Sequence, residues 1–234
     1  MFINLKIAIK RFLQSRFSLW LIKNKNFYGG LSKLSGIDLF VDIGANHGQF
    51  GPKIAELANL SIQRAVLVEP DTRCLTSLRK TEGFYSESCT VINKCVTSEK
   101  GPVKFHFFED SALNSLSEGD VIGSASHTVM VECISGEEIM RGSVYSENEI
   151  NLLKVDVQGA EEQVLKSFGD SLSLFDFVII EVSFFPYYKN QTEFSTIMEI
   201  LDTTHQYCGA LGEVYGEDGA LKYMNATFKR RKLI

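Results

Sequence analysis

Three carboxylates stand where a predicted buried strand ends. Asp42 follows the apolar residues 39–41, Glu69 follows residues 65–68, and Asp156 follows a third predicted strand. Because the carboxyl ends of parallel strands meet at one edge of a sheet, we expect these side chains to lie close together. A carboxylate there can accept hydrogen bonds from the hydroxyl or ammonium groups of a ligand, and it can also remove a proton. The pattern therefore predicts a site for a polar ligand.

A turn with two glycines follows the first of these strands. Residues 42–50 read D-I-G-A-N-H-G-Q-F, and a helical apolar pattern begins at Phe50. Gly44 and Gly48 permit a sharp bend and a close approach of backbone to ligand, and Asn46 tolerates left-handed backbone angles. A dinucleotide site would show G-x-G-x-x-G, so G-x-N-x-G favours a small adenosine ligand without a pyrophosphate. The alternative is a plain strand–turn–helix in which the glycines serve packing only.

Glu69 supports the ligand-binding interpretation of that turn. It stands 21 residues after Gly48, at the end of the second predicted strand, and Pro70 follows it. In a β-α-β unit, an acidic residue at this place reaches the ribose hydroxyls of a bound nucleoside. A lone glutamate at a strand end is usually just solvated, but its spacing from the turn favours ribose binding.

These motifs together resemble those of a known family. The stretches V-D-I-G-A-N-H-G-Q-F at 41–50, V-E-P at 68–70 and D-V-Q-G-A-E at 156–161 are similar to the FkbM-type S-adenosylmethionine-dependent methyltransferases. The resemblance runs from about residue 37 to about residue 182. It implies S-adenosylmethionine as cofactor, with the first motif at its methionine portion and Glu69 at its ribose. Gln158 stands where the family more often has glutamate, and Cys95 where alanine is common.

The predicted site residues follow from the strand ends and from this resemblance. The cofactor-binding residues are Asp42, Gly44, Asn46, Gly48, Glu69, Asn93, Cys95 and Asp156. The catalytic residues are Asp156, as the first choice for a general base, and Glu161, for which a helix-capping role is an equal alternative. Glu181 and His127 are further candidates for the base. No His-plus-carboxylate ligand cluster is visible, so no metal site is predicted, although a divalent metal held by Asp156 and a neighbouring acid stays open as an alternative.

The expected activity is methylation of a hydroxyl group on a saccharide, a surface glycan or a natural product. Two other classes stay open: a catalytically inactive nucleoside-binding module, and a nucleotide-sugar or NAD enzyme with a related α/β core. A net charge of −5 argues against nucleic-acid partners. Five cysteines without C-x-x-C spacing indicate a reducing compartment, and hence a cytoplasmic protein.

Alternating strand and helix patterns predict an α/β Rossmann-like methyltransferase fold with helices on both faces of the sheet. We expect seven strands, parallel except for one antiparallel strand, within a domain spanning 37–234. The third strand is expected at 90–96. Residues 103–134 are expected to form an antiparallel insertion, and residues 210–230 a terminal hairpin.

The first 36 residues are predicted to form a basic amphipathic helix and a lid-like segment. Residues 1–37 contain seven Lys or Arg and no Asp or Glu, interleaved with apolar residues at helical spacing. Such a helix can pack over the sheet or against a second subunit, as in a homodimer. Alternatively, residues 1–25 can lie on the inner membrane surface, but their apolar runs are too short to span a bilayer.

Overall fold

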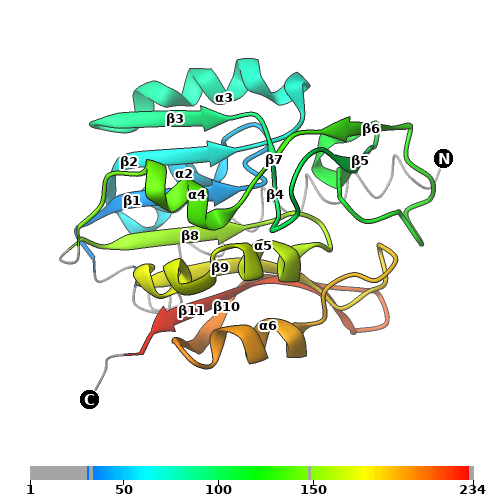
Figure 1. Cartoon of the computed structure of the whole chain (residues 1–234). Helices are drawn as coiled ribbons and strands as arrows, with labels where there is room; N and C mark the ends of the chain where they lie inside the picture. Colours follow the sequence, from blue (N-terminus) through cyan, green and yellow to red (C-terminus); the bar gives the residue numbers. More distant parts are fainter. Residues whose placement is uncertain (1–30, 32–33, 147–148, 232–234) are drawn as a thin grey trace.

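A computed structural model describes residues 31, 34–146 and 149–231 of the chain. Its central feature is a seven-stranded sheet in the order β10-β11-β9-β8-β1-β2-β3 (Figure 1). The strands are β1 (Gly36–Ile43), β2 (Ser61–Val68), β3 (Ser88–Ile92), β8 (Asn151–Val155), β9 (Phe177–Ser183), β10 (His205–Tyr215) and β11 (Leu221–Arg230). Strand β11 runs in the opposite direction to the other six strands, so the predicted fold class is confirmed.

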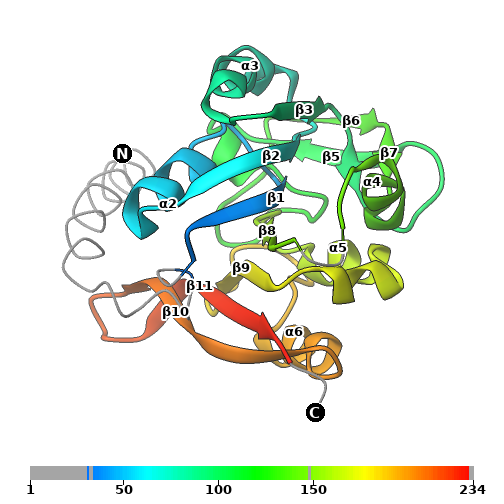
Figure 2. The same cartoon turned by 90° about the vertical axis from the view of Figure 1, so that its left-hand side faces the viewer.

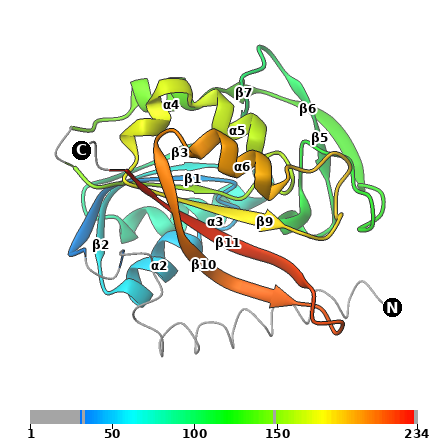
Figure 3. The same ribbon diagram turned by 90° about the horizontal axis from the view of Figure 1, so that it is seen from below.

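Helices cover both faces of this sheet (Figure 2). One face carries α2 (Phe50–Ala58) and α3 (Leu75–Thr81), and the other carries α4 (Gly136–Gly142), α5 (Glu161–Ser167) and α6 (Phe194–Leu201). Short 3-10 helices are η2 (Thr72–Cys74), η3 (Glu82–Phe84), η4 (Ser111–Leu113) and η5 (Gly169–Leu174). Figure 3 shows the same layers from below.

Strand β1 shows how the apolar sequence creates two cores. Val41 packs in the cluster with α4, α5 and α6, whereas Phe40 packs with α2 and α3, because successive side chains point to opposite faces. Asp42 continues this alternation and falls on the same face as Phe40. Its partner across the ladder to β8 is Lys154, so the register itself brings this acid and base together.

The insertion between β3 and β8 forms two small ladders beside the main sheet. Strands β5 (Val103–Phe107) and β6 (His127–Val131) pair antiparallel, as the sequence predicts. Strands β4 (Cys95–Val96) and β7 (Cys133–Ile134) pair parallel. The β5–β6 pair lies beyond the carboxyl ends of the parallel strands (Figure 1).

The structure corrects two expectations about this region. The third strand does not continue through 90–96: it ends at Ile92, and the Asn93 side chain donates to the carbonyls of Glu69 and Pro70, which turns the chain out of the sheet. Helix α4 was not expected, although Ser135 and Glu138 form a capping box at its start.

The expectations for the first 36 residues fall almost entirely outside the described residues. Leu31, which is described, is fully buried in the α2–α3 core. Within the part of the chain that the structure describes, none of the helices combines the length and the apolar character needed to cross a bilayer.

Candidate active site

The turn after β1 has the backbone conformation that its residues predict. Gly44, Asn46 and Gly48 have φ angles of 77°, 48° and 74°, all in the left-handed region. The amides of Gly44 and Ala45 donate to the carbonyl of Val68, at 3.0 and 3.1 Å, which fastens the turn to β2. A Cβ atom at Gly44 would overlap the carbonyl oxygen of Asp156. The loops after β1 and β8 therefore approach each other at a place that only glycine fits.

Glu69 is held beneath this turn by backbone donors. Its two carboxylate oxygens accept hydrogen bonds of 2.8 Å from the amides of Asn46 and Asp71. Burial raises the pKa of Glu69 to about 7, although these two amides act in the opposite direction. Each oxygen keeps a second lone pair, so the carboxylate can still accept hydrogen bonds from the hydroxyls of a ribose.

Asp42 is the most distinctive polar group of the site. It is 1% exposed, and neither of its carboxylate oxygens has a hydrogen-bond partner within the described structure. Burial raises its pKa to about 6, while Lys154 acts to lower it. A buried carboxylate without partners is costly, and a ligand that donates hydrogen bonds or brings a positive charge would relieve that cost.

A pocket of about 470 Å³ joins these groups. Of the predicted site residues, six line it: Asp42, Gly44, Asn46, Glu69, Cys95 and Asp156. Gly48, Asn93 and Glu161 are not among its lining residues. Gly48 packs on α3, where an added Cβ would press against Thr81 and Leu78. The strand ends are therefore brought together as expected, while three of the predicted residues support the pocket from outside.

Glu161 and His127, two candidates for the general base, lie away from the pocket lining. The Glu161 carboxylate accepts a hydrogen bond of 2.9 Å from the amide of Gly159, which precedes α5, and the helix begins without a side-chain cap. His127 is exposed and stacks on the ring of Phe107. Among the four candidates for the base, Asp156 and Glu181 are the two that face the pocket.

Two residues of the site had been given no role from the sequence. Lys154 is 3% exposed and its Nζ lies 3.1 Å from Asp156 Oδ2. Burial by itself lowers the pKa of Lys154, but the neighbouring carboxylates, Asp156 foremost, outweigh it and raise that pKa above its usual value. Gln158 donates from Nε2 to Asp156 Oδ1 at 2.6 Å and to Glu181 Oε1 at 2.8 Å.

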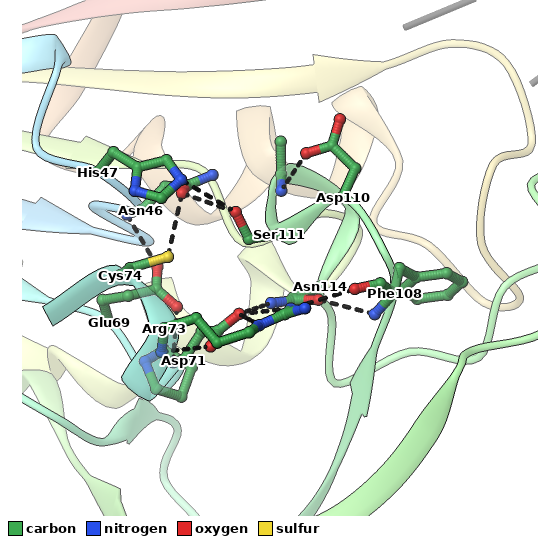
Figure 4. A network of polar contacts seen from close by, with 12 residues as sticks. Asn46, His47, Glu69, Asp71, Arg73, Cys74, Phe108, Asp110, Ser111 and Asn114 are labelled. Carbon is green, nitrogen blue, oxygen red and sulfur yellow. Dashed lines mark hydrogen bonds and ion pairs between the residues drawn. The ribbon is translucent and has the colours of Figure 1, made fainter. Parts of the chain in front are cut away.

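The insertion is fastened to the glycine turn at residues 44–48 through Asn46 (Figure 4). Asn46 Oδ1 accepts hydrogen bonds from Ser111 Oγ at 3.0 Å and from Cys74 Sγ at 3.2 Å. Ser111 also lies 3.4 Å from Nε2 of His47, whose Nδ1 lies 2.7 Å from Ser77 Oγ. The turn is therefore tied both to the insertion and to α3.

A second connection runs from Asp71 into the insertion (Figure 4). The buried Asp71 carboxylate pairs with Arg73 at 2.6 Å and accepts from Asn114 Nδ2 at 2.7 Å. Asn114 Oδ1 accepts from the amide of Phe108, whose carbonyl accepts from Arg73. Hydrogen bonds to the charged partner Arg73 hold the pKa of Asp71 below its ordinary value despite burial. The insertion thus forms a wall of the pocket rather than a detached arm.

Comparison with known proteins identifies the family of the chain. A family model described as the methyltransferase FkbM domain matches residues 42–211, most of the chain. The chain belongs to this family. The resemblance noted in the sequence is confirmed, and with it S-adenosylmethionine as the cofactor of this family. The chemistry of three features fits that cofactor. The Asp42 carboxylate, which has no hydrogen-bond partner in the described structure, can pair with an ammonium group, the glycine turn lets the backbone approach a ligand closely, and Glu69 can accept hydrogen bonds from a ribose.

Solved structures show the same fold at low sequence identity. The FkbM methyltransferase from Methylobacillus flagellatus KT aligns with a TM-score of 0.51 and 14% identity, over 82% of this chain and 43% of that one. TrmK from M. capricolum, in complex with S-adenosyl-homocysteine, aligns with a TM-score of 0.46 and 12% identity, over 86% of this chain and 66% of that one. This second likeness is too distant to bear on function. The chain thus spans less than half of the M. flagellatus protein.

No curated protein matches the chain at a significant level. Within the described residues, no group of three or more His, Cys, Asp and Glu side chains is arranged to hold a metal ion.

Proposed function

We propose that the protein transfers a methyl group from S-adenosylmethionine to a hydroxyl of a saccharide, surface glycan or natural product, with Asp156 as the general base. The observation that carries this proposal is the position of Asp156. It lines the same pocket as Asp42 and Glu69, and the cofactor turn touches its backbone at Gly44. A base placed against the cofactor turn can reach an acceptor hydroxyl that faces the methyl group.

The side chains around Asp156 fit this role. When bound, S-adenosylmethionine supplies a methyl group activated by its sulfonium. Lys154 and Gln158 hold one carboxylate oxygen of Asp156 each, at 3.1 and 2.6 Å. These contacts fix the orientation of the carboxylate that would take the proton of the acceptor hydroxyl. Most of the rate enhancement then comes from positioning, with proton removal adding to it.

The charge of the pocket favours an uncharged acceptor rich in hydroxyls. Five carboxylates and two lysines are among its lining residues, namely Asp42, Glu69, Asp110, Asp156, Glu181, Lys53 and Lys154. The excess of negative charge would repel an anionic acceptor, whereas the hydroxyls of a saccharide can donate hydrogen bonds to the carboxylates.

The experiment uses S-adenosylmethionine labelled in its methyl group and cell extracts separated into glycan, lipid and small-molecule fractions. Mass spectrometry would identify the labelled product, which we expect to be a methyl ether. Asp156→Asn should lower the transfer rate by about 10²- to 10⁴-fold, the usual contribution of a general base, while leaving S-adenosylhomocysteine affinity nearly unchanged.

Asp170→Asn, which alters an exposed acid in η5, is the matched control and should transfer at the normal rate. A methylated nitrogen in the product would contradict the hydroxyl acceptor. Full activity in Asp156→Asn would contradict the role of the base.

A further inference from the structure

Gln158 makes four polar contacts that tie together separate parts of the pocket wall. Its Nε2 donates to both Asp156 and Glu181, and its Oε1 lies 3.3 Å from the hydroxyl of Tyr188. Its backbone carbonyl accepts a hydrogen bond of 2.6 Å from Ser115 Oγ in the insertion. One side chain and its own backbone therefore connect the loop after β8 with β9, the loop that follows β9, and the insertion.

The backbone of Gln158 shows that this placement has a cost. Its φ angle is 58°, in the left-handed region that residues other than glycine and asparagine seldom adopt. Gly159 follows with a φ of 102°, so two successive residues leave the usual backbone regions. A strained position of this kind persists only where the surrounding contacts fix it, and it is typical of functional sites.

The orientation of the carboxamide is fixed by what lies at each end. The Tyr188 hydroxyl, which is 2.8 Å from the carbonyl oxygen of Leu113, faces Oε1. The two carboxylates face Nε2, and the two hydrogens of that nitrogen serve one carboxylate each. Since both acceptors share one nitrogen, Asp156 and Glu181 are close neighbours of like charge. Without a donor between them, one of the two would tend to take up a proton.

Other titratable groups surround this acid pair. Five of them interact electrostatically with Asp156, with Glu181 or with both, and they come from β1, β8, α5, β11 and the loop after β9: Asp42, Lys154, Glu161, Tyr223 and Tyr188. Asp110 of the insertion and Tyr187 act on Tyr188 and Tyr223 in turn. The acids among these groups oppose a second negative charge, whereas the neutral phenols do not. Lys154 supports ionisation of the pair, and it is already paired with Asp156. The neutral double donor of Gln158 therefore adds stabilisation where further carboxylates would act against it.

We propose that Gln158 is a positioning residue that keeps Asp156 and Glu181 ionised together at a fixed separation. Asp156 then stays available as the base, and Glu181 accepts a hydrogen bond from a second hydroxyl of the acceptor. The role of Gln158 in catalysis rests on the proposed function. The pairing of the acids themselves can be tested without any acceptor.

The first test compares Gln158→Leu with Gln191→Leu by thermal unfolding at pH 5.5 and pH 8. In Gln158→Leu the two carboxylates lose their shared donor, so the folded-state pKa of one of them rises above its unfolded value. A raised carboxylate pKa destabilises the fold increasingly as the pH rises, so the loss in Tm should be roughly twofold larger at pH 8 than at pH 5.5.

Gln191 is the matched control because it is also half-buried but donates to the carbonyls of Ser183 and Phe185, which do not titrate. Its variant should lose the same Tm at both pH values. Adding Glu181→Gln to Gln158→Leu removes the like-charge partner and should abolish the pH dependence. An equal loss at both pH values in Gln158→Leu would overturn the proposal. If Gln158→Leu does not fold, the double variant decides: its failure to restore folding at pH 8 overturns the proposal too.

The second test measures the pH profile of methyl transfer to the labelled fraction. In Gln158→Leu the fall of the transfer rate on the acidic side of the profile should occur about one pH unit higher. The reason is that Asp156 in this variant carries a proton, which it must lose before it can act as the base. Affinity for S-adenosylhomocysteine should stay the same. An acidic side of the profile that does not shift in Gln158→Leu would overturn the positioning role of Gln158. If the native protein methylates no fraction while the unfolding results hold, the proposed function fails and the role of Gln158 in the acid pair stands.

Discussion

The two halves of the pocket are built in different ways. The half at the ends of β1 and β2, which we propose binds the cofactor and call the cofactor half, depends mainly on backbone: left-handed turn residues and two amides that donate to Glu69. The half at the ends of β8 and β9, which we propose binds the acceptor and call the acceptor half, depends on side chains that hold one another, with Gln158 between Asp156 and Glu181. The first arrangement needs few particular side chains, and the second needs many.

This difference assigns a separate job to each half. A backbone-built half binds one invariant ligand, since its geometry follows from a short segment of chain. A half built from side chains can be re-formed for another acceptor without disturbing the cofactor. Changes in the cofactor half should therefore alter affinity for S-adenosylhomocysteine, and changes in the acceptor half should alter transfer alone.

The largest expected effect is at the place where the two halves touch. Gly44→Ala puts a Cβ onto the Asp156 carbonyl in addition to a left-handed φ, so it should lower the free energy of unfolding by about 3 kcal/mol or more. Gly101→Ala is the control, since Gly101 has a φ of 84° but open space around it. Gly101→Ala should lower the free energy of unfolding by only about 1 kcal/mol. Equal costs in urea unfolding would show that the contact is not tight.

A smaller loss should follow from removing the ribose acid. Glu69→Ala should weaken S-adenosylhomocysteine binding by about 1 to 3 kcal/mol, because charged hydrogen bonds are left unmade. Calorimetry would measure this affinity, with Glu87→Ala as the control, because that variant removes a half-exposed acid paired with Arg64 on the surface. Unchanged affinity in Glu69→Ala would remove Glu69 from the cofactor half.

The acids of the cofactor half also predict a pH dependence of binding. The pKa values of Asp42 and Glu69 are raised to about 6 and about 7, and the ionised forms are the ones that accept hydrogen bonds from the cofactor. Affinity for S-adenosylmethionine should therefore fall on the order of tenfold as the pH drops from 8 to 5.5. Asp42→Asn should bind more weakly and should flatten the lower part of this curve. A flat curve in the native protein would contradict these roles.

The smallest effect tests the acceptor half. Tyr188→Phe removes the hydroxyl that faces Gln158 and Leu113, so unfolding should require about 1 kcal/mol less. Affinity for S-adenosylhomocysteine should not change. A loss of that affinity would show that the two halves are coupled rather than separate.

The same contrast explains what could be predicted from the sequence. The turn at Gly44 and the acid at Glu69 were readable because their spacing along one β-α-β unit fixes their geometry. Helix α4 is also marked in the sequence, by the capping pair of Ser135 and Glu138. Gln158 could not be assigned, because its partners are Glu181, Tyr188 and Ser115, whose proximity exists only after folding.

The departure of the chain at Asn93 was likewise not predictable from strand propensity. The apolar pattern continues through Cys95 and Val96, and it is a side-chain contact with the loop after β2 that diverts the chain. Lys154 lies in the strand that ends just before Asp156, between the apolar residues Leu153 and Val155. Its role follows from the register that sets it opposite Asp42, which no local pattern contains.

The short parallel ladder of β4 and β7 has a consequence for the length of the insertion. Cys95 and Cys133 are direct partners in it, so the 37 intervening residues leave the body of the protein and return to it at one point. Lengthening such an excursion costs little conformational entropy, because closure entropy grows only slowly with length. The stretch can therefore change in length at little entropic cost, provided that the contacts of Ser111 with Asn46 and of Asn114 with Asp71 are kept.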